Sequence, residues 1–155
     1  MNTLQARAFF TGVLSGKKPL KFENALKELI KDDEEAAEMG EKVLKEIWTK
    51  CEAGLKKERK EMLKVTAKDL LGQVTELTAI GDYFLTGLTV AGTDFENMPN
   101  EDASDLLTEM EDHLLLLDEW VAEGEDGEKT AEWKKDGEKY KGEFLEIWKE
   151  LEEAL

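Results

Sequence analysis

Apolar residues recur every three or four positions along most of the chain, which is the spacing of α-helices that bury one face. The most apolar stretch is residues 68–94. Because this stretch is long and carries few charges, it predicts a buried central helix from about Glu61 to Ala91, on which the other helices pack. Its repeating apolar positions are Leu70, Val74, Leu77, Ile80, Phe84, Leu88 and Ala91.

Weaker apolar stripes on either side predict further helices, and no alternating pattern typical of β-strands appears. Asn2 and Gln5 have the spacing of a capping box at the start of the first helix. Gly92 and Pro99 mark the break after the central helix, and Asn100 or Asp102 would cap the helix that follows. The additional helices are expected at about residues 2–14, 22–57, 101–123 and 128–155.

These helices predict an all-α fold, a bundle of four or five helices in a single domain that covers residues 1–155. Residues 1–123 would form the core bundle. Residues 128–155 would form a C-terminal helix available for contact with a partner or a second copy. Trp133 and Trp148 on this helix are the aromatic residues expected to face such a partner.

The charge of the chain narrows the classes of function. The formal net charge is −16, from 21 Lys and Arg against 37 Asp and Glu. This charge argues against direct binding to nucleic acid, which needs clustered positive side chains, and against docking on an anionic membrane. It fits a soluble cytoplasmic protein, a binder of cations or basic proteins, or a mimic of nucleic acid. It fits equally a helical surface that is merely well solvated. No apolar stretch approaches the roughly 20 residues of a membrane span, and no secretory signal is expected.

Few residues remain as candidates for chemistry. Cys51 is the single cysteine, which suits a reducing compartment. His113 is the single histidine, and without His or Cys partners it forms neither a catalytic triad nor a zinc site. We therefore expect it on the surface or the flank of a helix. Carboxylates are therefore the remaining candidates. Acids on neighbouring helices can hold Mg²⁺, which in turn binds phosphates.

Two stretches resemble a known family. The segment D-E-E-A-A-E-M at 33–39 is similar to the E-E-x-x-E motif of the MazG-like all-α nucleoside triphosphate pyrophosphohydrolases. Residues 76–94 are similar to the next helix of that family, in which a Glu-x-x-Asp opens an apolar run that ends in Gly-x-Asp. The resemblance implies a helical bundle, a homo-oligomer, and Mg²⁺-dependent hydrolysis of nucleotides such as dUTP to the monophosphate and pyrophosphate.

The resemblance also implies roles for particular acids. Glu34, Glu35 and Glu38 match the first motif, and Glu76 matches the first acid of the second. Ala79 stands at the position of the second acid, so Asp82, one turn further on, would be an outer-shell or substitute ligand. Glu35, Glu38 and Glu76 would be the catalytic metal ligands, with Glu34 and Asp82 completing the Mg²⁺ site.

The phase of the helices points to a different set of acids. If residues 22–55 form one straight helix, Glu35 and Glu38 face away from the apolar stripe, whereas Asp33 falls inside it. On the central helix, Asp69 and Glu76 lie on one flank of the stripe. Asp33, Asp69 and Glu76 are therefore the acids expected at the edge of the core.

Three hypotheses about function follow. The first is a Mg²⁺-dependent NTP or dNTP pyrophosphohydrolase, active or degenerate, with a nucleotide as ligand. The second is a non-catalytic acidic interaction protein, such as an inhibitor, an adaptor or a nucleic-acid mimic, that binds a basic protein; this composition would suit a phage product. The third is a helical domain that contacts a partner through its aromatic C-terminal helix.

Overall fold

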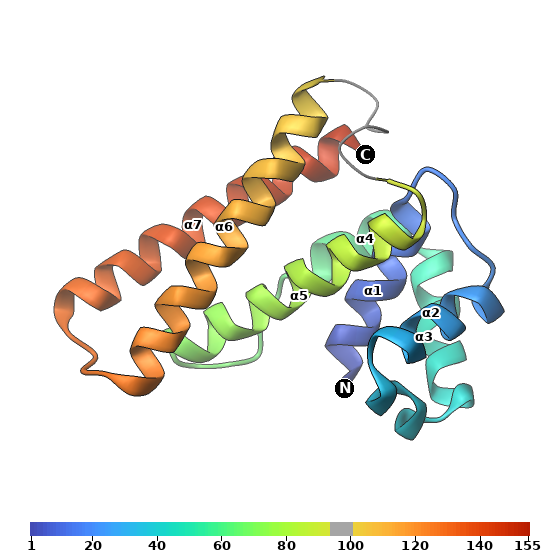
Figure 1. Cartoon of the computed structure of the whole chain (residues 1–155), viewed down its shortest axis with the longest axis horizontal. Helices are drawn as coiled ribbons and strands as arrows, with labels where there is room; N and C mark the ends of the chain where they lie inside the picture. The colour runs from blue at the N-terminus through green and yellow to red at the C-terminus, as the bar shows by residue number, and fades with distance from the viewer. Residues whose placement is uncertain (94–100) are drawn as a thin grey trace.

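The computed structural model describes residues 1–93 and 101–155, and within these ranges every regular element is a helix (Figure 1). The all-α bundle predicted from the sequence is thereby confirmed. The elements are α1 (Thr3–Ser15), α2 (Phe22–Asp32), the 3₁₀ helix η1 (Glu34–Met39), α3 (Glu41–Ala53), α4 (Leu55–Glu61), α5 (Leu70–Val90), α6 (Glu101–Asp126) and α7 (Ala131–Ala154).

Helix α5 is the central element, as its apolar sequence predicted. It lies between the N-terminal helices α1–α4 on one side and the hairpin of α6 and α7 on the other (Figure 1). Val74, Ile80 and Leu88 of α5 are completely buried.

The crossing of α1 and α5 is unusually close because glycines face each other there. A Cβ atom on Gly87 would collide with the carbonyl oxygen of Phe9, and one on Gly12 would collide with that of Phe84. Two backbones can approach so closely only where side chains are absent. This contact fixes α1 against the middle and C-terminal half of α5.

The stretch predicted as one helix over residues 22–57 is instead divided into four elements, so this prediction is wrong in detail. Asp33 leaves the helical conformation, with φ −141°, and its carboxylate caps η1. Gly40 then turns the chain with φ +87°, a conformation that costs glycine little. The breaks let Phe22 of α2 and Trp48 of α3 meet Phe10 of α1 in one aromatic cluster.

The central helix starts at Leu70 rather than at about Glu61, which corrects the predicted boundary. Residues 62–69 leave the helix, and Met62 is completely buried in the core. The Thr66 backbone N–H and hydroxyl both donate to the carboxylate of Glu76, at 2.9 Å each. This contact holds the connection against the first turns of α5.

Trp133 and Trp148 are buried, so the expectation that they face a partner is wrong. Their exposed fractions are 8% and 2%. Trp133 stacks on Trp120 of α6 with ring centroids 4.0 Å apart, and each indole N–H donates to the backbone carbonyl of the other tryptophan. Gly124 and Gly137 leave the space that these two rings occupy. The aromatic face of α7 is therefore used inside the chain.

Two smaller predictions concern single residues. The capping box of Asn2 and Gln5 is confirmed, with both reciprocal hydrogen bonds present. His113 is buried rather than on the surface, which corrects that expectation; its Nε2 lies 2.7 Å from the carbonyl oxygen of Tyr140. Since a carbonyl only accepts, Nε2 carries a proton there. The proposed break at Pro99 and cap at Asn100 lie outside the described residues.

None of the helices in the described ranges combines the length and the hydropathy that crossing a lipid bilayer requires.

Candidate functional site

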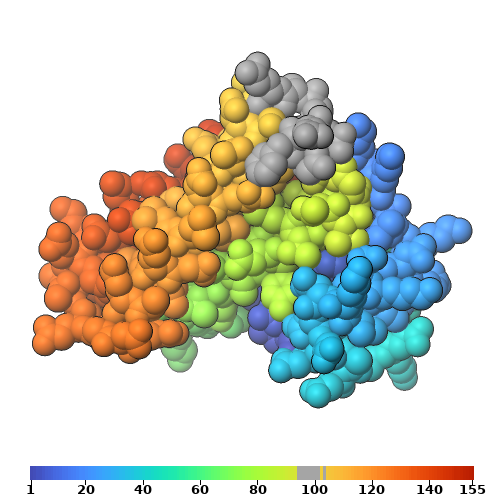
Figure 2. Space-filling view, viewed as in Figure 1, coloured from blue at the N-terminus to red at the C-terminus, as the bar shows by residue number. Residues whose placement is uncertain are grey.

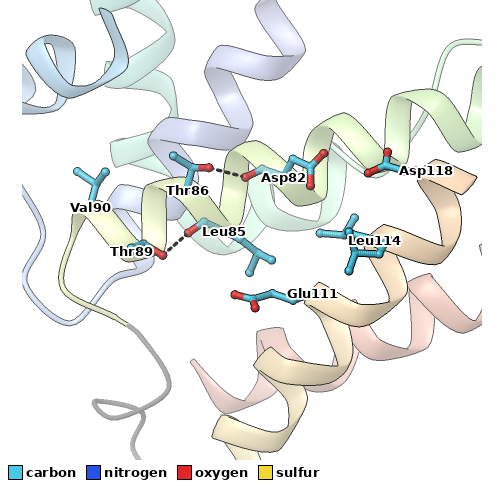
Figure 3. Close-up of a pocket in the computed structure, with 9 residues that line it drawn as sticks. Asp82, Leu85, Thr86, Thr89, Val90, Glu111, Leu114 and Asp118 are labelled. Carbon is cyan, nitrogen blue, oxygen red and sulfur yellow. Dashed lines mark hydrogen bonds between the residues drawn. The ribbon is translucent and has the colours of Figure 1, made fainter. Parts of the chain in front are cut away.

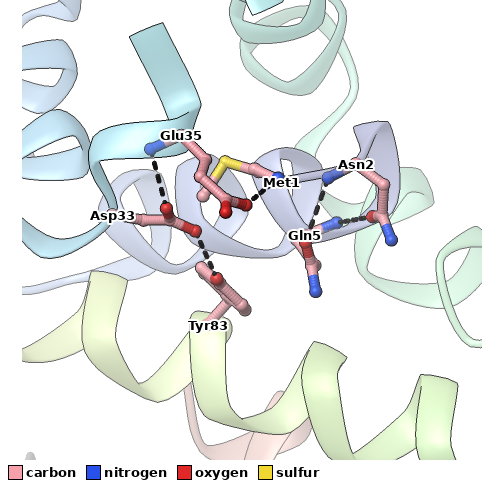
Figure 4. Close-up of polar contacts among 6 residues, drawn as sticks. All are labelled: Met1, Asn2, Gln5, Asp33, Glu35 and Tyr83. Carbon is pink, nitrogen blue, oxygen red and sulfur yellow. Dashed lines mark hydrogen bonds and ion pairs between the residues drawn. The ribbon is translucent and has the colours of Figure 1, made fainter. Parts of the chain in front are cut away.

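The three acids of the first motif lie on η1 with their side chains exposed. Glu34, Glu35 and Glu38 all point toward solvent. Glu35 accepts from the Met1 amino group at 3.2 Å (Figure 4). An exposed ion pair of this kind contributes little to stability.

Asp33, the acid that the helix phase placed at the edge of the core, joins η1 to α5. One of its oxygens accepts from the Glu35 backbone N–H at 3.0 Å, and the other accepts from the Tyr83 hydroxyl at 2.9 Å (Figure 4). Burial, together with the hydrogen bond and charge of Asp33, raises the pKa of Tyr83 to about 12. The phenol therefore keeps its proton and keeps donating, so Asp33 has a structural role.

Glu76 lies on the same flank of α5 as Tyr83, seven residues earlier, which is about 10 Å along the helix axis. Both of its oxygens accept from Thr66. This is a second acid with a local structural contact. Asp69, the remaining core-edge candidate, is the N-cap residue of α5 but makes no side-chain capping bond.

Asp82 faces a different side of α5 from Glu76, because it is one residue, or about 100° around the helix, from Tyr83. It points toward α6. Among the residues that the structure describes, no group of three Asp, Glu, His or Cys side chains is arranged to hold a metal ion. As placed here, Glu34, Glu35, Glu38, Glu76 and Asp82 do not form one ligand set for Mg²⁺, and metal binding stays a prediction.

A cleft of about 570 Å³ lies between α5 and α6 and is the main candidate site (Figure 3). In the space-filling view, the surface of α5 is visible between those of α6 and the N-terminal helices (Figure 2). We call this cleft the acidic groove. Its lining residues are Asp82, Leu85, Thr86, Thr89, Val90, Glu111, Leu114, Leu115 and Asp118.

The acidic groove carries three carboxylates and no positive side chain among its nine lining residues. Burial, and then the charge of Asp118, raises the pKa of Asp82 to about 6. Burial, and then the charge of Asp112, raises the pKa of Glu111 above its usual value. Asp82 and Glu111 keep exposed surface, yet the protein around them reduces their hydration. Their negative charge is therefore poorly compensated within the chain.

The groove is also partly apolar. Leu115 is 64% exposed, the highest value among the large apolar side chains that are exposed in the described residues. Leu85 and Val90 contribute from the α5 side. A smaller cleft lined by Glu28, Lys31, Asp32, Thr86 and Val90 continues across α5 toward α2. This surface combines exposed apolar area with negative charge.

Sequence reasoning did not single out Glu111 and Asp118, although a signal was present. The two acids are seven residues apart, on one flank of the stripe that contains Leu107 and Leu114. That spacing puts both on one side of a helix. These two acids lie near Asp82 only because of the way in which α6 crosses α5. The spacing of residues within one helix does not predict that crossing.

The fold and the groove define an all-α protein with an acidic, partly apolar cleft against its central helix. Comparison with known proteins gave no match: no protein-family model fits the sequence, and no curated protein or solved structure is significantly similar to it. The resemblance of residues 33–39 and 76–94 to the MazG-like enzymes therefore stays a prediction.

Proposed function

We propose that this protein is an acidic helical interaction protein whose acidic groove binds a cationic amphipathic segment of a partner protein. The observation that carries the proposal is the composition of the groove. Asp82, Glu111 and Asp118 line the cleft together with apolar side chains, including the exposed Leu115, and none of the described lining residues is a lysine or arginine.

The physical basis is complementarity of charge and of apolar surface. A helix with leucines on one face and lysines beside them would bury its apolar face against Leu115 and Leu85, as in other helix-in-groove complexes. Its lysines would then lie beside the three carboxylates. The net charge of −16 would steer such a segment toward the protein and speed association at low salt.

The test is calorimetric titration with a synthetic amphipathic peptide that carries leucines at helical spacing and lysines elsewhere. We expect binding that weakens steeply as salt rises from about 50 to about 500 mM, because screening removes the attraction of exposed charges. The triple variant Asp82→Asn, Glu111→Gln, Asp118→Asn should raise Kd by about tenfold or more, since each exposed pair contributes up to about 1 kcal/mol.

A matched control removes the same charge elsewhere. Glu23, Glu46 and Glu132 are exposed acids on α2, α3 and α7 that do not line the acidic groove. The variant Glu23→Gln, Glu46→Gln, Glu132→Gln should raise Kd less than about threefold, through the general field alone. An equal rise in Kd in the two triple variants would contradict the proposal, because the affinity for the peptide would then depend on net charge and not on the groove.

Metal-dependent nucleotide hydrolysis is the second candidate, and one observation favours it. Asp33 ties η1, which carries the first motif, to Tyr83, and Glu76 of the second motif lies on that same flank of α5. If Mg²⁺ were held there, it would neutralise phosphate charge. The family resemblance also implies a homo-oligomer, and analytical sedimentation would measure the oligomeric state.

A phosphate-release screen over nucleoside triphosphates, with Mg²⁺ and added inorganic pyrophosphatase, tests this second candidate. Turnover that is lost in Glu76→Gln and retained in Glu132→Gln would support it. Circular dichroism must accompany the screen, because Glu76 also anchors Thr66. No turnover by the folded wild-type protein would remove this candidate and leave the acidic groove as the functional surface.

A further inference from the structure

A cluster of positive side chains lies at a second cleft, although the net charge of the chain is −16. This cleft has a volume of about 470 Å³ and lies between α4 and the C-terminal part of α7. We call it the basic cleft. Its lining residues are Lys56, Arg59, Lys60, Lys149, Glu152 and Glu153. Lys149 is distant in sequence from the other three cations, so the fold brings it to them.

The four cations of the basic cleft have no direct ion pair within the described residues. Nearby lysines on the same two helices behave differently. Lys57 of α4 lies 3.7 Å from Glu61, and Lys139 of α7 lies 4.0 Å from Glu143. With Glu152 and Glu153 counted, four positive and two negative side chains leave the cleft with two excess positive charges.

Arg59 is held in place beside the cleft. Its Nη1 donates to the Ser15 hydroxyl at 3.3 Å, while its Nε is buried and has no acceptor in the part of the chain that the structure describes. A buried donor without an acceptor destabilises the folded chain. Because Arg59 lines the cleft and its guanidinium is held by Ser15, it presents a fixed positive charge to a ligand with strongly accepting oxygens.

We propose that the basic cleft binds a small phosphate-bearing anion. A phosphate group carries a charge of about −1.5 to −2 at pH 7, which matches the two excess positive charges of the cleft. Lysine ammonium groups and an arginine guanidinium are the side chains that bind phosphate oxygens best. The site is separate from the acidic groove, which is built from α5 and α6.

Calorimetric titration with inorganic pyrophosphate tests the proposal, in buffer of constant ionic strength that contains EDTA. The chelator ensures that any binding is independent of metal. We expect Kd below about 1 mM for the wild-type protein. Lys60→Gln with Lys149→Gln should weaken binding by about tenfold or more, since both ammonium groups line the cleft. Both side chains are exposed, so the fold should tolerate the change.

The control is Lys57→Gln with Lys139→Gln, which removes two positive charges from the same helices outside the cleft. This control should change Kd less than about twofold, through the general field alone. Absence of binding at millimolar pyrophosphate, or equal weakening in both double variants, would overturn the proposal. Binding of the cationic peptide to the acidic groove should be unaffected by Lys60→Gln with Lys149→Gln. The proposals for the two sites are therefore tested independently.

Discussion

At the scale of single residues, the fold depends on positions where a side chain is absent. Gly87 of α5 lies directly against the backbone of Phe9 and Val13 in α1, and Gly12 lies against Phe84 and Gly87 in return. Gly142 of α7, by contrast, has no atom of the described residues within 4 Å of the place where a Cβ would stand. The two kinds of glycine should therefore respond to alanine in opposite ways.

We expect Gly87→Ala to destabilise the protein by about 3 kcal/mol, because the new methyl group meets backbone that cannot move aside easily. Gly142→Ala should stabilise it by about 0.5–1 kcal/mol, because alanine favours an exposed helical position. Urea denaturation of both variants measures these differences. Equal effects of the two substitutions would show that α1 and α5 do not cross as closely as described.

The raised pKa of Asp82 leads to a second prediction, which concerns the stability of the protein. Its pKa in the folded protein, about 6, lies above the usual value of 3.8. Ionisation of Asp82 therefore opposes folding, and its contribution to stability is lost as pH rises between these two values. Asp82→Asn should stabilise the protein at pH 7 by about 1 kcal/mol once solvent screening of this exposed side chain is allowed for.

Thermal unfolding at two pH values checks the prediction for Asp82. At pH 7 the midpoint of Asp82→Asn should exceed that of the wild type by about 2–4 °C. At pH 4 most of this difference should disappear, because Asp82 is then largely protonated in the folded protein. A gain of the same size at both pH values would contradict a raised pKa and indicate a packing effect.

At the scale of helices, periodicity predicted which residues are buried better than where each helix ends. The stripe from Phe22 to Cys51 does reach the core, since Phe22, Leu29, Leu44 and Cys51 are all buried. The breaks at Asp33 and Gly40 were not predicted, because the apolar spacing continues across them. Asp33 caps η1 with one oxygen, and its other oxygen accepts from the hydroxyl of Tyr83 on α5, a contact that local spacing does not contain. Contacts between elements decide such boundaries.

One buried ion pair joins α1 to α4. Glu58 is 3% exposed, and one of its oxygens accepts from Nε and Nη2 of Arg7 at 3.0 and 2.8 Å. Glu58→Leu should destabilise the protein by about 3 kcal/mol or more, because it leaves a partly buried guanidinium without its partner. Adding Arg7→Met should recover much of that loss.

Urea denaturation of the two single variants and the double variant completes this thermodynamic cycle. We expect the double variant to be more stable than Glu58→Leu alone. If the two losses simply add, Arg7 and Glu58 are not coupled, and the attachment of α4 to α1 rests on apolar packing instead.

At the scale of the whole molecule, the chain places opposite charges at two separate clefts. The acidic groove is built on α5 and α6, and the basic cleft on α4 and α7. The acidic composition and the all-α class could be predicted from the sequence. The grouping of Asp82 with Glu111 and Asp118 could not, because it arises where two helices cross and no local spacing records that crossing. The position of Lys149 beside Lys60 could not be predicted either, because it depends on how α7 and α4 are placed.

The motif acids illustrate the same limit. Glu34, Glu35 and Glu38 were singled out by local similarity, and the structure places them on an exposed 3₁₀ turn. Asp82, chosen only as a substitute for the acid missing at Ala79, instead lines the acidic groove. Of the acids that line the acidic groove, the resemblance to the MazG-like enzymes had singled out only Asp82, and that resemblance remains a prediction.

The most direct test of the acidic groove is an amide-resolved NMR titration of the wild-type protein with the cationic amphipathic peptide. If the groove is the binding surface, the largest shift changes will fall within residues 82–90 of α5 and 111–118 of α6. They will be small on α3 and on η1. Shift changes spread evenly over the acidic surface, or centred on η1 and Glu76, would contradict the account.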